Sequence, residues 1–183
     1  MKPINHVFYW EYPAGTIPDE LIAQTQAVVQ KQTRIEGQIG DGSVDTKIRS
    51  VERTPLDEFE AISVFLFGLA VKANNALFRF DLGGPSQFEM LHYTKKGDHY
   101  DCHADTQMYD NGFSRKLSVM GYFNDDYVGG RFYFKVFADE RHYVDIKKGT
   151  VLVFPPYIQH GVEPVEDGVR EGVVGWITGP NFR

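Results

Sequence analysis

The chain is poor in the features that mark disulfide-bonded and membrane-embedded proteins. Cys102 is the single cysteine among 183 residues, so no disulfide can form within the chain. The start of the sequence has no apolar segment typical of a signal peptide. Together with the lone cysteine, this leads us to expect a cytoplasmic protein. The longest apolar run, residues 61–71, includes Ser63 and Gly68 and is too short to cross a bilayer, so we expect no membrane partner.

An excess of basic residues is also absent. Lys and Arg total 19 against 25 Asp and Glu, which gives a formal net charge of −6. Nucleic-acid binding needs a clustered basic surface, so we expect no nucleic-acid partner. Hydrophobic residues make up 42% and charged residues 24%, a composition typical of a globular domain. The sequence shows no repeat or linker, and it does not indicate an oligomeric state.

Glycine and aromatic residues are plentiful, and they favour a protein with many strands and turns. Residues 18–32 predict a helix, because Pro18 suits a first turn and apolar residues follow at a period of 3.6. Pro55 similarly predicts the start of a second helix that runs to residue 77. The remaining sequence alternates turns with short β-type runs. These cover residues 78–82, 88–93, 100–103, 116–123, 131–137, 143–146, 150–154, 161–164 and 171–178.

This pattern predicts one α+β domain, mainly β, that spans residues 1–183. Eight or nine short strands at this spacing are typical of a β-sandwich or jelly roll. We expect residues 1–77 to be mainly helical support, with the helices packed on one sheet. Residues 78–183 should form the jelly-roll core.

Three side chains in the β region suggest a metal site. Two imidazoles and one carboxylate, here His103, His160 and Asp105, are the ligand set of a non-haem Fe(II) site with open positions. Residues two apart on an extended chain project to the same side, so His103 and Asp105 can reach one ion. Taken alone, this pair is explained better by a polar strand end that faces solvent than by a metal site. His160 follows a rigid Pro155-Pro156 turn, and its alternative role is a core histidine bonded to a carbonyl.

Arg170 lies ten residues beyond His160 and suits an anion anchor. In an extended strand Arg170, Gly172 and Trp176 share one face. A buried arginine is costly unless it is paired, and its fork matches a carboxylate in two parallel hydrogen bonds. Taken alone, a surface ion pair would explain Arg170 better. Beside His160, a bound dicarboxylate is favoured.

Several segments resemble a known enzyme family. Residues 93–105, YTKKGDHYDCHAD, resemble the Tyr-Gly-Tyr-His-Asp segment of prolyl 4-hydroxylase-like dioxygenases that depend on 2-oxoglutarate and Fe(II). The closest resemblance is to bacterial PKHD-type hydroxylases, and it extends from about residue 45 to the end of the chain. Further matching segments are residues 48–50, 73–75, 115–118, 127–132, 149–155, 160–165 and 168–170, with Trp176.

The resemblance implies a double-stranded β-helix, a jelly roll with the metal at its mouth. It implies Fe(II) on His103, Asp105 and His160, and 2-oxoglutarate chelating that iron. The far carboxylate of 2-oxoglutarate would be held by Arg170 and the Tyr93 hydroxyl. Ascorbate is a further candidate cofactor. Pocket-lining candidates are Tyr100, Tyr109 and Trp176.

The expected reaction is hydroxylation by O₂ with release of succinate and CO₂. A peptidyl prolyl residue is the first candidate substrate, and a free amino acid or another metabolite is an alternative. Residues 104–114 and 134–142 are expected to lie at the mouth and select it. The rival interpretation is a metal-binding jelly roll without oxygenase activity, such as a cupin-like isomerase or sensor, although cupins favour an HxH pattern. A nucleic-acid demethylase fits the acidic charge poorly, and a purely structural sandwich leaves the candidate ligands unexplained.

Overall fold

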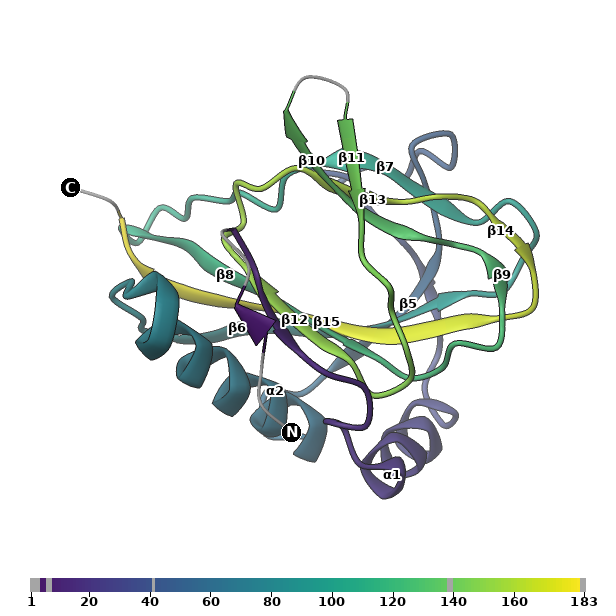
Figure 1. Ribbon diagram of the computed structural model, residues 1–183, viewed down its shortest axis with the longest axis horizontal. Coiled ribbons are helices and arrows are strands. Elements are labelled where there is room, and N and C mark those ends of the chain that lie inside the picture. Colours follow the sequence, from purple (N-terminus) through teal and green to yellow (C-terminus); the bar gives the residue numbers. More distant parts are fainter. Residues whose placement is uncertain (1–3, 6–7, 41, 138–139, 182–183) are drawn as a thin grey trace.

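Two antiparallel sheets that face each other form the body of the computed structural model, which describes residues 4–5, 8–40, 42–137 and 140–181 (Figure 1). The main sheet comprises β1 (Ile4–Asn5), β2 (Trp10–Tyr12), β3 (Ile35–Glu36), β5 (Glu52–Leu56), β6 (Gly84–Tyr93), β8 (Phe113–Tyr122), β12 (Val151–Phe154) and β15 (Arg170–Pro180). The smaller sheet comprises β4 (Arg49–Ser50), β7 (His99–His103), β10 (Phe132–Phe137), β11 (Glu140–Tyr143) and β13 (His160–Val162). β9 (Val128–Gly129) pairs with β14 (Val165–Asp167).

The strand order is that of a jelly roll, as predicted. It runs β1-β2-β12-β8-β15-β6-β5-β3 in the main sheet and β11-β10-β13-β7-β4 in the smaller one. Alternation along β15 shows how the sequence builds two cores. Val173 and Ile177 pack on the outer side of the main sheet, whereas Val174 and Trp176 point between the sheets. The space between the sheets is where Arg170, at the start of β15, is also buried.

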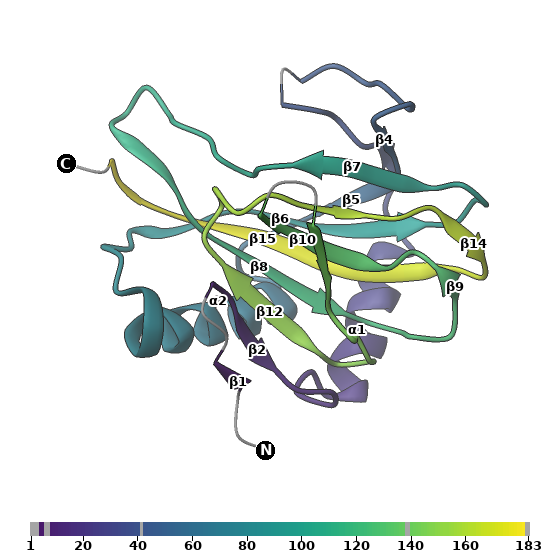
Figure 2. The same ribbon diagram turned by 45° about the horizontal axis from the view of Figure 1, so that its top comes forward.

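Helices α1 (Asp19–Val29) and α2 (Ala61–Ala73) cover the outer face of the main sheet (Figures 1 and 2). The π-helix Asn74–Phe78 continues α2, so the helical segment is 18 residues long. By length and composition alone it is apolar enough to cross a membrane, a test that a core helix packed inside a protein also passes. In this fold its buried side chains, including Ile62 and Leu66, pack on the main sheet.

The predicted boundaries fail most clearly around Pro55, which belongs to β5 and not to a helix. In the described structure β3 pairs only with Glu52 and Arg53 of β5, so Pro55 lies where the outer edge of the strand has no neighbour. A missing N–H is tolerated at such an edge. Residues 1–77 are therefore not mainly helical, because they also contribute strands β1 to β5. The strand expected at residues 78–82 is absent from the described structure, and β6 begins at Gly84.

Candidate metal centre

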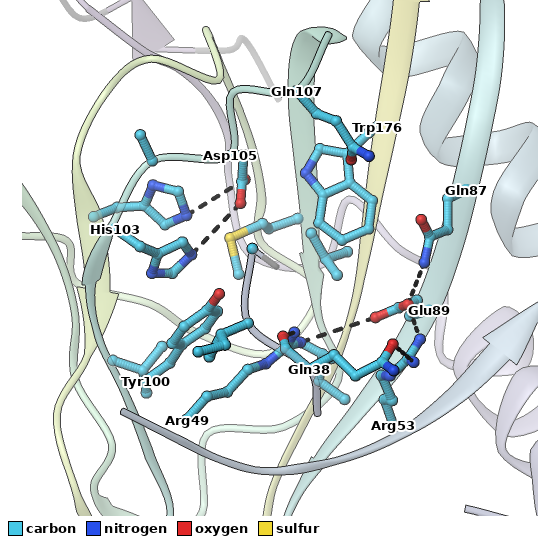
Figure 3. A pocket seen from close by; sticks show the side chains of 18 of the residues that line it. Gln38, Arg49, Arg53, Gln87, Glu89, Tyr100, His103, Asp105, Gln107 and Trp176 are labelled. Carbon is cyan, nitrogen blue, oxygen red and sulfur yellow. Dashed lines mark hydrogen bonds and ion pairs between the residues drawn. The ribbon is translucent and has the colours of Figure 1, made fainter. Parts of the chain in front are cut away.

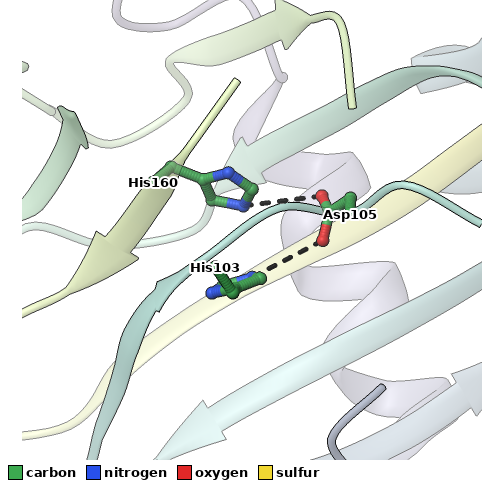
Figure 4. Close-up of side chains that lie close together, drawn as sticks. All are labelled: His103, Asp105 and His160. Carbon is green, nitrogen blue, oxygen red and sulfur yellow. Dashed lines mark ion pairs between the residues drawn. The ribbon is translucent and has the colours of Figure 1, made fainter. Parts of the chain in front are cut away.

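The three predicted ligands converge at one end of the space between the sheets (Figure 4). His103 ends β7 and His160 begins β13, and the two residues are register partners on these neighbouring strands. Asp105 lies two residues beyond β7. Its Oδ1 is 3.5 Å from His103 Nε2, and its Oδ2 is 3.5 Å from His160 Nε2. One ligand atom from each residue lies within 4.8 Å of the others, so a single ion can contact all three.

Backbone and side-chain hydrogen bonds hold the three side chains in position. His103 Nδ1 is 2.7 Å from the Asp101 carbonyl, and His160 Nδ1 is 2.9 Å from the Ile158 carbonyl. Because a carbonyl only accepts, each Nδ1 carries the hydrogen and each Nε2 presents a lone pair towards Asp105. The Ser118 hydroxyl donates to Asp105 Oδ2 at 2.7 Å, so the carboxylate is also oriented.

Burial sets the protonation states that a metal needs. His160 is 4% exposed, and this burial lowers its pKa to about 4, against the opposing effect of Asp105. Burial alone would raise the pKa of Asp105, but the imidazoles of His160 and His103 hold it well below its usual range. The site therefore offers a carboxylate and a neutral imidazole near neutral pH. The His-x-Asp pair is not a solvent-facing strand end, because Asp105 is 7% exposed.

Arg170 is the largest fully buried side chain and lies beside Tyr93, its register partner on β6. Its guanidinium carbon is 4.8 Å from the centre of the Tyr93 ring and 5.4 Å from that of Tyr122. Within the described structure Nε and Nη2 of Arg170 have no hydrogen-bond partner. Buried donors without acceptors are costly, so these two atoms fit the far carboxylate of a dicarboxylic acid.

The roles of two residues near Arg170 were not predicted from the sequence. Tyr122 shares a face of β8 with Met120, and period-two alternation could have placed it there. Gly130 has a positive φ of 57°, and a Cβ at this position would be 3.1 Å from Arg170 Cδ. A Gly-Gly pair such as Gly129-Gly130 is a turn signal in a sequence, but it does not reveal that the second glycine makes room for an arginine.

A cavity of about 680 Å³ opens beside the ligands (Figure 3). Its lining includes all three candidate ligands together with Tyr100 and Trp176. Tyr93 lines it too, whereas Arg170, its register partner on β15, is not among the described lining residues. The Tyr100 ring stacks on the His103 ring, with centroids 3.5 Å apart and planes inclined by 18°.

The structure does not bring every predicted mouth residue to this cavity. Tyr109 lies outside the lining, in a hairpin turn where its hydroxyl is 3.5 Å from Gln107 Oε1. From the same segment, Ala104 and Gln107 do line the cavity. In the other expected mouth segment, Phe134 packs in the core between the sheets, and Asp139 lies outside the described residues. The charged and amide-bearing lining residues that the sequence did not predict are Gln38, Arg49, Arg53, Gln87, Glu89 and Arg115.

The model of the 2OG-Fe(II) oxygenase superfamily matches residues 88–178, a range that includes the three ligands and Arg170. Over this range, which is just under half of the chain, the sequence is similar to this superfamily. A PKHD-type hydroxylase from Synechococcus elongatus is 30% identical over 111 residues, which cover 57% of this chain and 49% of that relative. One from Idiomarina loihiensis is 28% identical over 98 residues, covering 49% of this chain and 43% of the relative. The chain thus spans about half the length of the curated relatives it matches.

Solved structures of the superfamily share the fold. A prolyl hydroxylase from Trichoplax adhaerens, in complex with a hypoxia-inducible factor peptide, superimposes with a TM-score of 0.77 at 17% identity, covering 94% of this chain and 84% of that one. A prolyl-4-hydroxylase from Pseudomonas putida superimposes with a TM-score of 0.73 at 20% identity, and the match covers 94% of this chain and 93% of that one. The double-stranded β-helix predicted from the sequence is therefore confirmed. Fe(II) and 2-oxoglutarate are the cofactor and cosubstrate of this superfamily, and the triad and the unpaired donors of Arg170 fit both.

Proposed function

We propose that this chain is a dioxygenase that uses Fe(II) and 2-oxoglutarate to hydroxylate an organic substrate. The observation that carries the proposal is the combination of the His-Asp-His triad with a buried arginine, Arg170, whose Nε and Nη2 lack acceptors in the described structure. When bound, Fe(II) and 2-oxoglutarate supply the oxidation of a substrate C–H bond by O₂, with succinate and CO₂ as by-products.

The residues of the chain orient the reactants and exclude water. His103, Asp105 and His160 would hold the metal on one side, which leaves its cavity side open. Arg170 and the Tyr93 hydroxyl would hold the far carboxylate of 2-oxoglutarate and so fix the position of its keto-acid end relative to the triad. The apolar part of the cavity wall separates the reacting groups from solvent. It is formed by Leu91, Met120, Phe132, Val162 and Val174.

The substrate class is a separate part of the proposal. The prolyl hydroxylase neighbours make a peptidyl prolyl residue one candidate, and a free amino acid or another small metabolite is the other. O₂ is the second substrate in either case. No observation favours the cupin-like alternative, since the triad holds a carboxylate and the matched family is an oxygenase family. A role for ascorbate stays a prediction.

The test combines metal binding with turnover. Anaerobic addition of Fe(II) and then 2-oxoglutarate should give the charge-transfer absorption of a keto acid chelated to iron, and air should then yield succinate. His103→Ala, Asp105→Ala and His160→Ala should each abolish both signals. His99→Ala is the matched control, because His99 bonds to backbone carbonyls away from the triad. Retention of both signals in all three ligand variants would refute the proposed function.

A further inference from the structure

Three arginine side chains line the cavity, and two of them, Arg49 and Arg53, lie away from Asp105 (Figure 3). Arg49 of β4, Arg53 of β5 and Arg115 of β8 line the cavity. Apart from the ligand Asp105, Glu89 is the one carboxylate among the described lining residues. Arg115 lies beside the triad, where its Nη1 donates to the Asp105 backbone carbonyl at 3.2 Å. Arg49 and Arg53 therefore face Glu89 alone, and one positive charge is left over. In a chain with a net charge of −6, such a cavity wall is unlike the rest of the protein.

Arg53 forms the closer of two ion pairs with Glu89. Arg53 Nη1 and Gln87 Nε2 both donate to Glu89 Oε1, and Arg53 Nη2 donates to Gln38 Oε1 at 2.7 Å. Arg49 Nη2 lies 3.9 Å from Glu89 Oε2, which is too far for a hydrogen bond. Arg53 therefore forms the closer ion pair with Glu89, and Arg49 has only a longer ion pair with the same carboxylate.

Arg49 is buried without adequate partners. It is 8% exposed, and among the described residues its one hydrogen bond runs from Nη1 to the Gln38 carbonyl at 2.6 Å. Its Nε has no hydrogen-bond partner there. A buried guanidinium with this few acceptors is costly, and a ligand that brings an anionic group would offset the cost. The protein thus holds a second unsatisfied arginine, separate from the Arg170 anchor.

The position of Arg49 limits the size of the ligand. Its guanidinium carbon lies 4.6 Å from the centre of the Tyr100 ring, and Tyr100 stacks on the ligand His103. Figure 3 shows the Tyr100 ring between the two side chains. An anionic group at Arg49 would therefore be about one aromatic ring away from the metal ligands. A molecule that reaches both has only a few bonds between its anionic group and its reacting carbon.

We propose that the part of the cavity beside Arg49 binds the free carboxylate of the substrate, with Arg49 as the anion-binding residue. Arg53 is a positioning residue, because its close pairing with Glu89 leaves Arg49 only a longer ion pair with that carboxylate. The inference rests on the proposed hydroxylase function and narrows its substrate to a small carboxylic acid or the carboxyl-terminal residue of a peptide. An internal peptide residue presents a neutral amide instead, which would leave the buried charge of Arg49 without a close counter-ion.

The experiment uses the common L-amino acids as probes, each in three forms. These are the free acid, the N-acetyl acid and the N-acetyl amide. Binding is measured by calorimetry on protein loaded with Zn(II) and saturating 2-oxoglutarate, which occupies the Arg170 anchor and prevents turnover. For the best-binding side chain, we expect the acid to bind at least about 30-fold more tightly than its amide. The two acid forms then distinguish a free amino acid from a peptide carboxyl terminus.

Variants assign the preference to Arg49. Arg49→Gln should remove the advantage of the acid over the amide, whereas Arg49→Lys should keep part of it. Arg53→Gln should also weaken acid binding, because Glu89 would then be free to neutralise Arg49. Arg131→Gln is the matched control, since Arg131 is exposed and pairs with Glu163 outside the cavity. It should leave every affinity unchanged.

Three results would overturn the inference. They are amides that bind as tightly as acids, full acid affinity in Arg49→Gln, or no acid binding to protein that still binds 2-oxoglutarate. Turnover with Fe(II) separates this inference from the function it rests on. If acids bind through Arg49 but no succinate forms with Fe(II) and O₂, the proposed function fails and the carboxylate site stands. If amides alone stimulate succinate formation, the function stands and the carboxylate site fails.

Discussion

Replacing Arg170 by methionine should separate 2-oxoglutarate binding from metal binding. Arg170 is 1% exposed, and its Nε and Nη2 have no acceptor in the described structure. It does not contact the triad through any described hydrogen bond or ion pair. Methionine has a similar length and no charge, so the variant removes the anion anchor while filling much of the same space.

The expected magnitude follows from this burial. Loss of a hydrogen-bonded charged pair in a largely dry site costs about 2–5 kcal/mol, which raises the dissociation constant for 2-oxoglutarate by about 30- to 5,000-fold. The thermal stability of the cosubstrate-free protein, by contrast, should not be reduced by the substitution. Replacing a buried, unpaired charge by an apolar side chain is often neutral or stabilising, so we expect its Tm not to fall.

Calorimetric titration of the Zn(II)-loaded protein with 2-oxoglutarate measures the affinity, and thermal unfolding measures the stability. The wild type should gain Tm when 2-oxoglutarate is added, and Arg170→Met should lose that gain at the same concentration. Arg131→Met, at an exposed arginine, is the control. An Arg170→Met protein that binds 2-oxoglutarate as tightly as the wild type would show that another residue holds the far carboxylate.

Three further predictions concern the surroundings of the triad. Ser118→Ala removes the hydrogen bond that orients Asp105 and should weaken metal binding by about 10- to 100-fold in a competition titration, whereas unchanged affinity would deny Ser118 this role. Because the pKa of His160 is about 4 when folded and about 6.5 when unfolded, the metal-free protein should lose stability as the pH falls from about 6.5 to about 4. Urea unfolding across this range checks the slope, which His160→Gln should flatten. Shortening residues 109–112, a hairpin turn closed by Tyr109 and Phe113, should leave metal and 2-oxoglutarate affinity near normal but raise the succinate formed per hydroxylated product. Unchanged coupling would argue against a role in closure.

The metal ligands could be predicted because their chemistry and their spacing are both local. His103 and Asp105 are two residues apart, and the Pro155-Pro156 turn marks the entry to the strand of His160. Period-two alternation also placed Arg170 and Trp176 on the inner face of β15. In each case the signal lies within a few residues of the functional side chain.

The part of the cavity that holds Arg49 and Arg53 could not be predicted in the same way. Arg49 and Arg53 lie on the short strands β4 and β5, which were not predicted as strands from the sequence, and Pro55 imitates a helix start. Their function depends on Glu89, which belongs to a strand more than thirty residues away in the sequence. Only the pairing of β5 with β6 brings these charges together, and that register is a property of the whole sheet.

The register pairing of His103 with His160 also matters for how the chain folds. The two residues are 57 positions apart in the sequence, yet they face each other across neighbouring strands. Closing so long a loop costs chain entropy before any contact between the strands compensates for it. A metal held by both imidazoles acts as a cross-link across this loop, and it can form only after β7 and β13 have met. Metal loading should therefore follow folding of the jelly roll and then slow its opening at the mouth.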